Sequence, residues 1–450
     1  MNKKNTANTP NPSQDSPLLE VRIEKLLNGG DGLARHESQA IFVPLTAPGD
    51  EVRVRVKKKS KNFSIAKVKE ILQPGPGRRE APCPHFGHCG GCNLQHIEID
   101  NQRQAKADIV TDCFQRLGKM DITDLLTGPD SAGRDFGYRN RIRVFATGTG
   151  PYGMMRRGTN DVVALETCLL MPEQFNTDIL PWLRMLPPVE QIVIRLDGAG
   201  GWLLSAFGPP TRQKILRKMV GSLAPGEAPA PGCVGLMFNN LPIWGRDHLI
   251  HEIAGHKFRV SPRSFFQANH EITEDAVATI RQWITELAEE NQLGDLLGDL
   301  FCGVGLFSLT LADLFKQVVA IDSDESACRD AINNVKHDPD AKGKVTVCNG
   351  DLASVLKDTD LAGPELWKQS FCLADPPRTG LGAEGVKRLL DLSPRHVLFM
   401  SCDPATMARD SAQLVEGGYH PVKLKVLDMF PQTSHIETLM LFSKQDGSLD

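Results

Sequence analysis

The sequence predicts an α/β protein in which a C-terminal parallel sheet, covered by helices on both faces, follows a small antiparallel β-barrel and a mixed α/β central region. Three observations lead to this fold class. From about residue 261, short apolar runs alternate with helical stretches, which is typical of a parallel sheet between two helical layers. Residues 18–74 instead hold short segments of alternating apolar and polar residues separated by Gly, Asp and Pro, a pattern typical of a small barrel. The length of 450 residues corresponds to two or three domains of roughly 100 to 200 residues each.

The composition is that of a globular chain, with 41% hydrophobic residues, 24% charged residues and a formal net charge of −4. No run of about 18 apolar residues occurs, so we expect no membrane span. Residues 1–17 are rich in Asn, Thr, Pro and Ser and are expected to form a disordered tail without the apolar core of a signal peptide. These features predict a cytoplasmic protein whose 11 cysteines stay reduced.

The barrel segment, residues 18–74, is strongly basic in its later half. Between Arg53 and Arg79 there are ten Lys or Arg residues and one acid, Glu70. A charge run is usually only a solvated face, but period-two alternation places Arg53, Arg55 and Lys57 on one side of a strand. This pattern favours a surface that contacts the phosphates of a nucleic acid.

A Pro- and Gly-rich linker at residues 73–82 leads into a central domain, predicted over residues 75–260. This region mixes β-like runs such as QIVIRL and GWLLSAF with Pro-rich loops, and it contains a second basic cluster between Arg134 and Arg157. The C-terminal domain is predicted over residues 261–450. Its last two segments, HPVKLKVLDMF and HIETLMLF, leave no room for a helix between them and predict an antiparallel hairpin at one sheet edge.

A ligand crevice is predicted where the strands of the C-terminal sheet end. The segment D-L-F-C-G-V-G, residues 299–305, joins a buried strand to a helix, and Asp322, Asp351 and Asp375 follow the next three strands. Acids at the carboxyl ends of parallel strands line one crevice, where a carboxylate can accept both ribose hydroxyls. Because the third glycine of a dinucleotide fingerprint is missing, a single-nucleoside cofactor such as S-adenosylmethionine fits this crevice better.

Two further residues suggest covalent catalysis. Cys402 follows the strand HVLFM and precedes a helix, where a helix N-terminus favours the thiolate. Glu437 begins the final, otherwise apolar strand. A buried cysteine is more often a small packing residue, and a strand glutamate is more often solvent-facing. Methylation of carbon 5 of uracil, however, requires a thiolate that adds to carbon 6 and a base that removes the carbon 5 proton.

The strings DLFCGVG, LADPPRTGL, SCDPATMARD and LDMFPQTSHIET resemble those of the RNA (uracil-5-)-methyltransferase family, and the resemblance covers most of the chain. It implies a Rossmann-like class I methyltransferase domain, an OB-like TRAM barrel that binds RNA, and S-adenosylmethionine as the cofactor. It also implies that Cys402 is the nucleophile and Glu437 the base. Cofactor contacts are implied for six residues: Gln267 in SPRSFFQAN, Phe301, Gly303, Asp322, Asp351 and Asp375. One departure is Leu306, where relatives often carry a polar residue.

Three cysteines, Cys83, Cys89 and Cys92, lie in the linker after the barrel with the spacing C-x₅-C-x₂-C. Three close thiols in a Gly- and Pro-rich loop indicate a metal centre. The spacing alone does not distinguish a zinc ion from an iron–sulfur cluster. It also does not identify the fourth ligand, for which the candidates are His85, His88, Cys113 and Cys168. The family resemblance implies Cys168 and a [4Fe-4S] cluster.

The resemblance gives a leading function and two alternatives. The leading one is 5-methyluridine formation in 23S ribosomal RNA, and the closest alternative is the same reaction in the thymine loop of transfer RNA. A non-catalytic iron–sulfur RNA-binding protein is the alternative from another class, which the presence of both Cys402 and Glu437 disfavours. We expect RNA as the partner, no obligate protein partner, and a monomer. The sequence does not indicate which uridine is modified.

Overall fold

The computed structural model describes residues 18–130, 133–147, 151–356 and 361–444, so the tail predicted at residues 1–17 lies outside the described residues. The chain divides into two compact units. The first contains residues 1–87, 92–105 and 432–434, and the second contains residues 88–91, 106–431 and 435–450. Within the described ranges, no helix combines the length and apolar composition needed to cross a bilayer.

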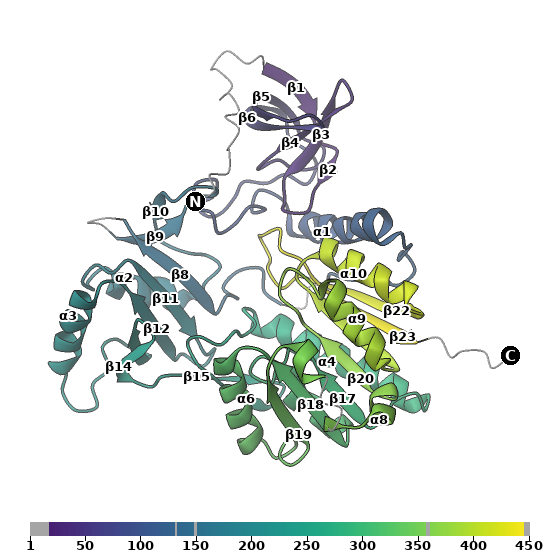
Figure 1. Ribbon diagram of the computed structural model, residues 1–450. Coiled ribbons are helices and arrows are strands. Elements are labelled where there is room, and N and C mark those ends of the chain that lie inside the picture. Colours follow the sequence, from purple (N-terminus) through teal and green to yellow (C-terminus); the bar gives the residue numbers. More distant parts are fainter. Residues whose placement is uncertain (1–17, 131–132, 148–150, 357–360, 445–450) are drawn as a thin grey trace, which may run out of the picture. The chain divides into compact units, whose positions relative to one another are not determined.

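The first unit contains a six-stranded sheet in the order β1-β5-β6-β4-β3-β2 (Figure 1). Its strands are β1 (Leu18–Arg22), β2 (Lys25–Leu26), β3 (Gly32–His36), β4 (Gln39–Val43), β5 (Glu51–Lys59) and β6 (Phe63–Gln73). The predicted alternation is confirmed in β5, which buries Val52 and Val54 in the barrel core. The expectation of a wholly antiparallel barrel is wrong at one pair, because the β5–β6 hairpin returns β6 parallel to β4.

The second unit contains a central seven-stranded sheet in the order β10-β9-β8-β11-β12-β13-β14. The strands are β8 (Arg141–Ala146), β9 (Tyr152–Met155), β10 (Val162–Ala164), β11 (Gln191–Leu196), β12 (Trp202–Phe207), β13 (Cys233–Phe238) and β14 (Leu241–Gly245). The helical segments η2 (Phe175–Ile179), α2 (Leu180–Leu183) and α3 (Pro210–Gly221) complete this region. The runs IRVFAT, QIVIRL and GWLLSAF are confirmed as strands, and they share one apolar core with η2 and α2.

The same unit contains the predicted parallel sheet, whose order is β19-β18-β17-β20-β21-β23-β22-β7. Strands β17 (Leu296–Asp299), β18 (Gln317–Asp322), β19 (Val345–Asn349), β20 (Phe371–Ala374) and β21 (His396–Ser401) pair in parallel. The predicted hairpin is confirmed as β22 (Tyr419–Leu427) and β23 (Glu437–Lys444). It is not the outermost element, because the two-residue strand β7 (Leu126–Thr127) pairs in parallel with β22.

Helices connect these strands, as the alternating pattern predicts. They are α4 (His270–Glu289), α5 (Leu306–Thr310), η3 (Ala312–Leu314), α6 (Glu325–His337), α7 (Leu352–Val355), α8 (Pro364–Lys368), α9 (Gly382–Leu392) and α10 (Pro404–Glu416). Earlier in the chain, α1 (Ile99–Cys113) continues into η1 (Phe114–Gly118), and η1 packs on α10. Side-chain caps begin the helices at defined residues: Asn269 caps α4, and the Asp324 carboxylate accepts the Ala327 amide at the start of α6.

The core of the C-terminal sheet extends beyond the predicted domain. The hairpin β15 (Leu249–Ile253) and β16 (His256–Val260) precedes residue 261, yet it buries Phe258 and Val260 in the same cluster as Leu297 of β17 and Leu398 of β21. The side chain of Leu306 also lies in this core, which explains how an apolar residue is accommodated there.

Candidate active site

The predicted nucleophile and base are neighbours across one pair of strands. Strands β21 and β23 pair antiparallel, with Ser401 opposite Thr438. Cys402 follows Ser401 and Glu437 precedes Thr438, so the pairing places both predicted residues at the same end of the sheet. Asp375 reaches this end as well, because it follows β20, the parallel neighbour of β21.

Glu437 lies in an environment that disfavours its charged form. Its side chain is buried, and its Oε1 atom has no hydrogen-bond partner among the described residues. Burial and, secondarily, the charge of Asp375 raise the pKa of Glu437 well above its ordinary value, whereas the Arg378 guanidinium acts in the opposite direction. The pKa of Asp375 is itself raised, by burial and by the charge of Asp299. This end of the sheet therefore holds two carboxyl groups whose protonated forms are favoured by burial and by the charge of a neighbouring carboxylate.

The surroundings of Cys402 oppose the expected stabilisation of its thiolate by a helix N-terminus. Burial, followed by the charge of Glu437, raises the pKa of Cys402 to about 11. The helix amides are already engaged, because the Asp403 carboxylate accepts hydrogen bonds from the N–H groups of Ala405 at 2.9 Å and Thr406 at 3.0 Å. Arg378 is the neighbouring group that favours the thiolate.

The glycine turn after β17 has the open geometry that a cofactor crevice needs. Gly303 and Gly305 both have positive φ, at 54° and 87°, and a Cβ built on Gly303 would have no heavy atom within 4 Å. The Gly303 amide donates to Asp322 Oδ2 at 2.9 Å, and the Asp324 amide donates to Asp322 Oδ1 at 2.8 Å. The turn and the carboxylate thus form one preorganised unit, with Phe301 immediately before it.

Asp351 and Gln267, two further predicted cofactor residues, have different settings. Asp351 is exposed and caps α7 by accepting the Ser354 amide at 3.0 Å. Gln267 is buried and donates from Nε2 to Asp375 Oδ2 at 3.2 Å. Its backbone carbonyl accepts from Asn140 Nδ2 at 2.8 Å. Gln267 therefore belongs to the catalytic end of the sheet, whereas Asp351 lies on the surface beyond β19.

The structure adds three residues that we did not single out from the sequence. Arg378, in the LADPPRTGL string, influences Cys402 and Glu437 and contacts His435 Nδ1 at 3.2 Å. Burial and the charge of Arg378 lower the pKa of His435 to about 4. Asp299 is fully buried, and burial raises its pKa to about 7 while Ser308 donates to it at 2.6 Å. The motif strings contain all three, but only the folded chain shows their proximity.

The four predicted cluster cysteines are divided between the two units. Cys83 and Cys92 belong to the first unit, and both are half-buried cysteines that form no disulfide. Cys89 and Cys168 belong to the second unit and are neighbours there, because burial and, to a smaller extent, the Cys89 charge raise the pKa of Cys168. Asn176 fixes the Cys168 backbone through bonds of 2.7 Å to its N–H and 3.2 Å to its carbonyl.

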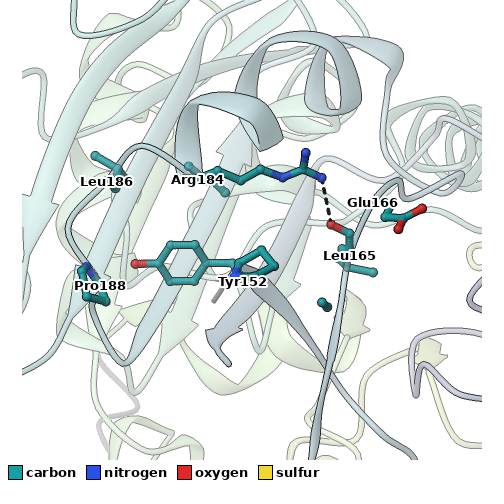
Figure 2. Close-up of a pocket in the computed structure, with 9 residues that line it drawn as sticks. Tyr152, Leu165, Glu166, Arg184, Leu186 and Pro188 are labelled. Atoms are coloured by element: carbon teal, nitrogen blue, oxygen red, sulfur yellow. Dashed lines mark hydrogen bonds between the residues drawn. The ribbon is translucent and has the colours of Figure 1, made fainter. Parts of the chain in front are cut away.

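Two other features of the second unit have no link to the predicted site. A cavity of about 890 Å³ in the central region is lined by Tyr152, Leu165, Glu166, Arg184 and Leu186, among others (Figure 2). It contains none of the predicted site residues. The polar ends of Tyr152 and Arg184 are used in bonds to the backbone at Val189 and Leu165, respectively.

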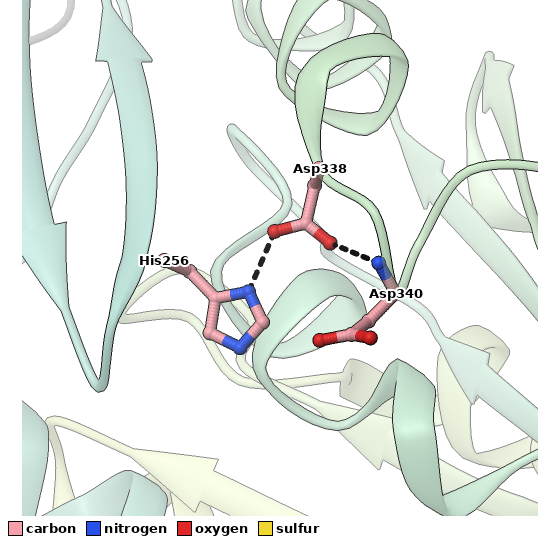
Figure 3. A group of neighbouring side chains, drawn as sticks. All are labelled: His256, Asp338 and Asp340. Atoms are coloured by element: carbon pink, nitrogen blue, oxygen red, sulfur yellow. Dashed lines mark hydrogen bonds and ion pairs between the residues drawn. The ribbon is translucent and has the colours of Figure 1, made fainter.

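The second feature is the group formed by His256, Asp338 and Asp340 (Figure 3). Asp338 accepts from His256 Nδ1 at 2.6 Å and from the amides of Asp340 and Ala341 at 3.0 and 2.9 Å. These bonds close the turn after α6, so the group has a structural explanation without a metal ion.

Comparison with known proteins identifies the family. Residues 246–445 match the model of the tRNA (uracil-5-)-methyltransferase family, and residues 19–76 match the TRAM domain of tRNA (uracil(54)-C(5))-methyltransferase. An uncharacterised RNA methyltransferase of Aquifex aeolicus is 31% identical over 96% of this chain and 100% of its own length. The 23S rRNA (uracil(1939)-C(5))-methyltransferase RlmD of Salmonella typhi is 31% identical over 95% of this chain and 96% of its own length.

A solved structure shares the fold. The tRNA (uracil-54, C5)-methyltransferase of Pyrococcus abyssi, in complex with S-adenosyl-L-homocysteine, superposes with a TM-score of 0.68 at 22% identity and covers 94% of this chain and 99% of that one. This likeness confirms the predicted α/β fold with its N-terminal TRAM barrel. Together with the two full-length relatives, it shows that the chain belongs to the RNA (uracil-5-)-methyltransferase family of enzymes.

Proposed function

We propose that this enzyme methylates carbon 5 of a specific uridine in 23S ribosomal RNA, with S-adenosylmethionine as the methyl donor. The observation that carries the proposal is the position of Cys402 beside Glu437 at the end of β21 and β23, at the same edge of the sheet as the glycine turn after β17. The relative from Salmonella typhi, named for the 23S substrate, matches the chain over nearly its whole length.

The crevice fits a nucleoside cofactor with a positively charged sulfur. Open space beside Gly303 leaves room for a ligand to approach the backbone. Asp322, at the end of β18, is positioned to accept ribose hydroxyls. We assign cofactor contacts to Gln267, Phe301, Gly303, Asp322 and Asp375. We assign Asp351 to the rim of the site, because it is exposed.

When it is bound, S-adenosylmethionine supplies an electrophilic methyl group. The chain's own residues do the rest. The thiolate of Cys402 adds to carbon 6 of the uracil, which makes carbon 5 nucleophilic enough to accept the methyl group. Glu437 then takes the proton from carbon 5, and the electron pair that is released expels the Cys402 thiolate and restores the 5,6 double bond. Arg378 favours the ionised forms of both residues.

The roles of the other regions are proposed from charge and fold. We propose that the TRAM barrel at residues 18–74 and the central domain at 75–260 bind RNA, and that residues 261–450 transfer the methyl group, after a tail at residues 1–17. In the barrel, Arg53 is already paired with Glu20 at 2.7 Å and with Glu70. Arg55 and Lys57, on the same strand, are therefore the better phosphate contacts.

We also propose that Cys83, Cys89, Cys92 and Cys168 hold a [4Fe-4S] cluster. None of the four forms a disulfide, and cysteine thiolates are the soft ligands that an iron–sulfur centre uses. Because methyl transfer from a sulfonium requires no net electron transfer, the cluster's proposed role is to fix the linker after the barrel and to position RNA.

A second candidate substrate is the thymine loop of transfer RNA. The TRAM model and the Pyrococcus abyssi enzyme are both named for uracil-54 of tRNA. Mapping 5-methyluridine in ribosomal and transfer RNA from a strain that lacks the gene separates the two substrates. Loss of one 5-methyluridine from 23S RNA supports the proposal, and loss from tRNA alone overturns it.

The chemistry is tested with Cys402→Ala and Glu437→Gln enzyme. Cys402→Ala is expected to abolish methylation while binding S-adenosylmethionine nearly as wild type. Glu437→Gln is expected to accumulate methylated RNA covalently attached to Cys402, visible as a slow band on a denaturing gel. Cys233→Ala, which removes a buried thiol of the central core, is the matched control and should turn over. Near-wild-type turnover by Cys402→Ala would refute the nucleophile assignment.

A further inference from the structure

The central sheet presents a row of arginines on the face opposite its apolar core. Alternation along β8 buries Ile142 and Val144 in that core and places Arg141 and Arg143 on the other face. On the neighbouring strand β11, Arg195 pairs directly with Arg141 (strands β8 and β11 in Figure 1). Arg143 is exposed, Arg141 is half-buried, and Arg195 is buried, with only 6% of its surface accessible.

These arginines lack the carboxylate partners that buried cations normally have. In the described part of the chain, no carboxylate lies within ion-pair distance of Arg141, Arg143 or Arg195. Arg195 uses Nη1 to donate to the carbonyls of Ser261 and Ser264, at 3.3 and 2.7 Å. Its Nε atom is buried and has no partner among the described residues.

Burial and the charges of neighbouring arginines both disfavour the charged forms of Arg141 and Arg195. Burial, followed by the charges of Arg143 and Arg139, lowers the pKa of Arg141. Burial and the charge of Arg141 lower the pKa of Arg195 to about 9, whereas the charge of Asp330 acts in the opposite direction. The same basic stretch contains a contrasting residue. Arg134 is neutralised by Glu271, to which its Nε donates at 2.7 Å. Arg141 and Arg143 thus differ from Arg134, which has a carboxylate partner.

The residues that precede Arg141 in the chain, Arg139 and Asn140, connect the row to the proposed catalytic site. Arg139 donates from Nε to the carbonyl of Arg141 at 3.1 Å, and its charge, together with that of Arg378, acts on His435. Asn140, the next residue, holds the backbone of Gln267. A strand that delivers its uridine to Cys402 would therefore have its flanking backbone close to Arg141 and Arg143.

We propose that Arg141 and Arg143 bind a phosphodiester group of the RNA strand next to the methylated uridine, and that Arg195, opposite Arg141 on the neighbouring strand, adds positive charge. Planar guanidinium groups pair with phosphate oxygens through two parallel hydrogen bonds, and this contact would supply the counter-charge that the chain does not. The inference rests on the proposed function, because it assumes that RNA enters the site of Cys402.

The test compares the salt dependence of RNA binding in the full-length enzyme. The probe is ribosomal RNA from cells that lack the enzyme. Each lost phosphate contact should reduce the slope of log K against log salt by about 0.7. We expect this reduction for Arg143→Gln, and about twice as much for Arg141→Gln/Arg143→Gln, with a higher KM for RNA and unchanged S-adenosylmethionine binding. Arg143 is exposed, so the single variant should fold.

Arg134→Gln is the matched control, since it removes the same charge from a residue already paired with Glu271. Its slope should equal that of wild type. Wild-type slopes and KM in both Arg143 variants would overturn the inference, as would an equal change in Arg134→Gln, which would indicate only a general effect of net charge. Failure of the proposed function would give a different result. The wild-type enzyme would then not methylate the ribosomal RNA, whatever the salt dependence of RNA binding.

Discussion

At the scale of single residues, the sequence motif around Cys402 and its folded environment favour different ionisation states of the thiol. A position before a helix predicts an activated thiolate. The Asp403 side chain, however, takes the first helix amides, and Glu437 stands where a like charge opposes ionisation. Burial and the Glu437 charge therefore favour the thiol form of the proposed nucleophile, whereas the charge of Arg378 and a backbone hydrogen bond at Cys402 favour the thiolate.

This balance predicts how Glu437→Gln changes the reactivity of Cys402. Wild-type Cys402, with a pKa of about 11, should be alkylated faster as pH rises, because the thiolate fraction grows about tenfold per pH unit below the pKa. Removing the Glu437 charge should lower the thiol pKa, so the variant should react faster at pH values where Glu437 is ionised in wild type. At low pH, where Glu437 is protonated, the two proteins should react alike.

The measurement is iodoacetamide labelling of the Cys402 peptide, followed by mass spectrometry between pH 6 and 10. Cys348, read from the same samples, is the internal control and should be unaffected by the substitution. Identical Cys402 profiles in wild type and Glu437→Gln would contradict the electrostatic coupling of the pair.

At the scale of elements, the connection between β22 and β23 positions Glu437 through a buried ion pair. Lys106 of α1 donates to Asp428 Oδ1 at 2.5 Å and to the Phe430 carbonyl at 3.1 Å. The Lys106 and Asp428 side chains are only 1% and 2% exposed. Removing one partner of such a pair leaves an uncompensated charge, which costs about 3 to 5 kcal/mol.

We therefore expect Lys106→Met to lower the Tm markedly, and Lys106→Met/Asp428→Leu to recover most of the loss because neither charge remains. Lys316→Met is the matched control. Its ion pair with Asp295 is exposed and should contribute no more than about 1 kcal/mol. Thermal unfolding followed by circular dichroism provides the comparison. Equal Tm values for Lys106→Met and Lys316→Met would show that the buried pair does not stabilise the connection.

Elements also differ in how far the sequence could predict them. Four of the five parallel strands, β17, β18, β20 and β21, are mostly buried, largely apolar runs. Such runs are typical of strands in a parallel sheet and are easily recognised between more polar segments. Strand β7 has only two residues, Leu126 and Thr127, too few to show a period. The parallel pairing of β4 with β6 depends on where the β5–β6 hairpin docks, which alternation along either strand does not encode.

At the scale of the whole molecule, the proposed active site combines residues that are far apart in the sequence, from position 267 to position 437. This separation limits how much of the site can be predicted from the sequence. Cys402 and Glu437 could be assigned because the reaction requires one nucleophile and one base. Arg378 acts on the pKa of Cys402, and Asp299 acts on the pKa of Asp375, only because the fold brings each pair together. Their roles therefore had to come from the structure.

The proposed iron–sulfur cluster gives the molecule-scale prediction, because its ligands come from regions 76 residues apart, at Cys92 and Cys168. Anaerobically purified enzyme should be brown, with about four irons per chain. Cys168→Ser should lose most of the iron and bind RNA more weakly, yet bind S-adenosylmethionine normally, because the glycine turn and Asp322 are untouched. Cys113→Ser is the control and should retain its iron. Stoichiometric zinc without visible absorption would refute the cluster, and full iron retention in Cys168→Ser would move the fourth ligand elsewhere, with Cys113 tested next.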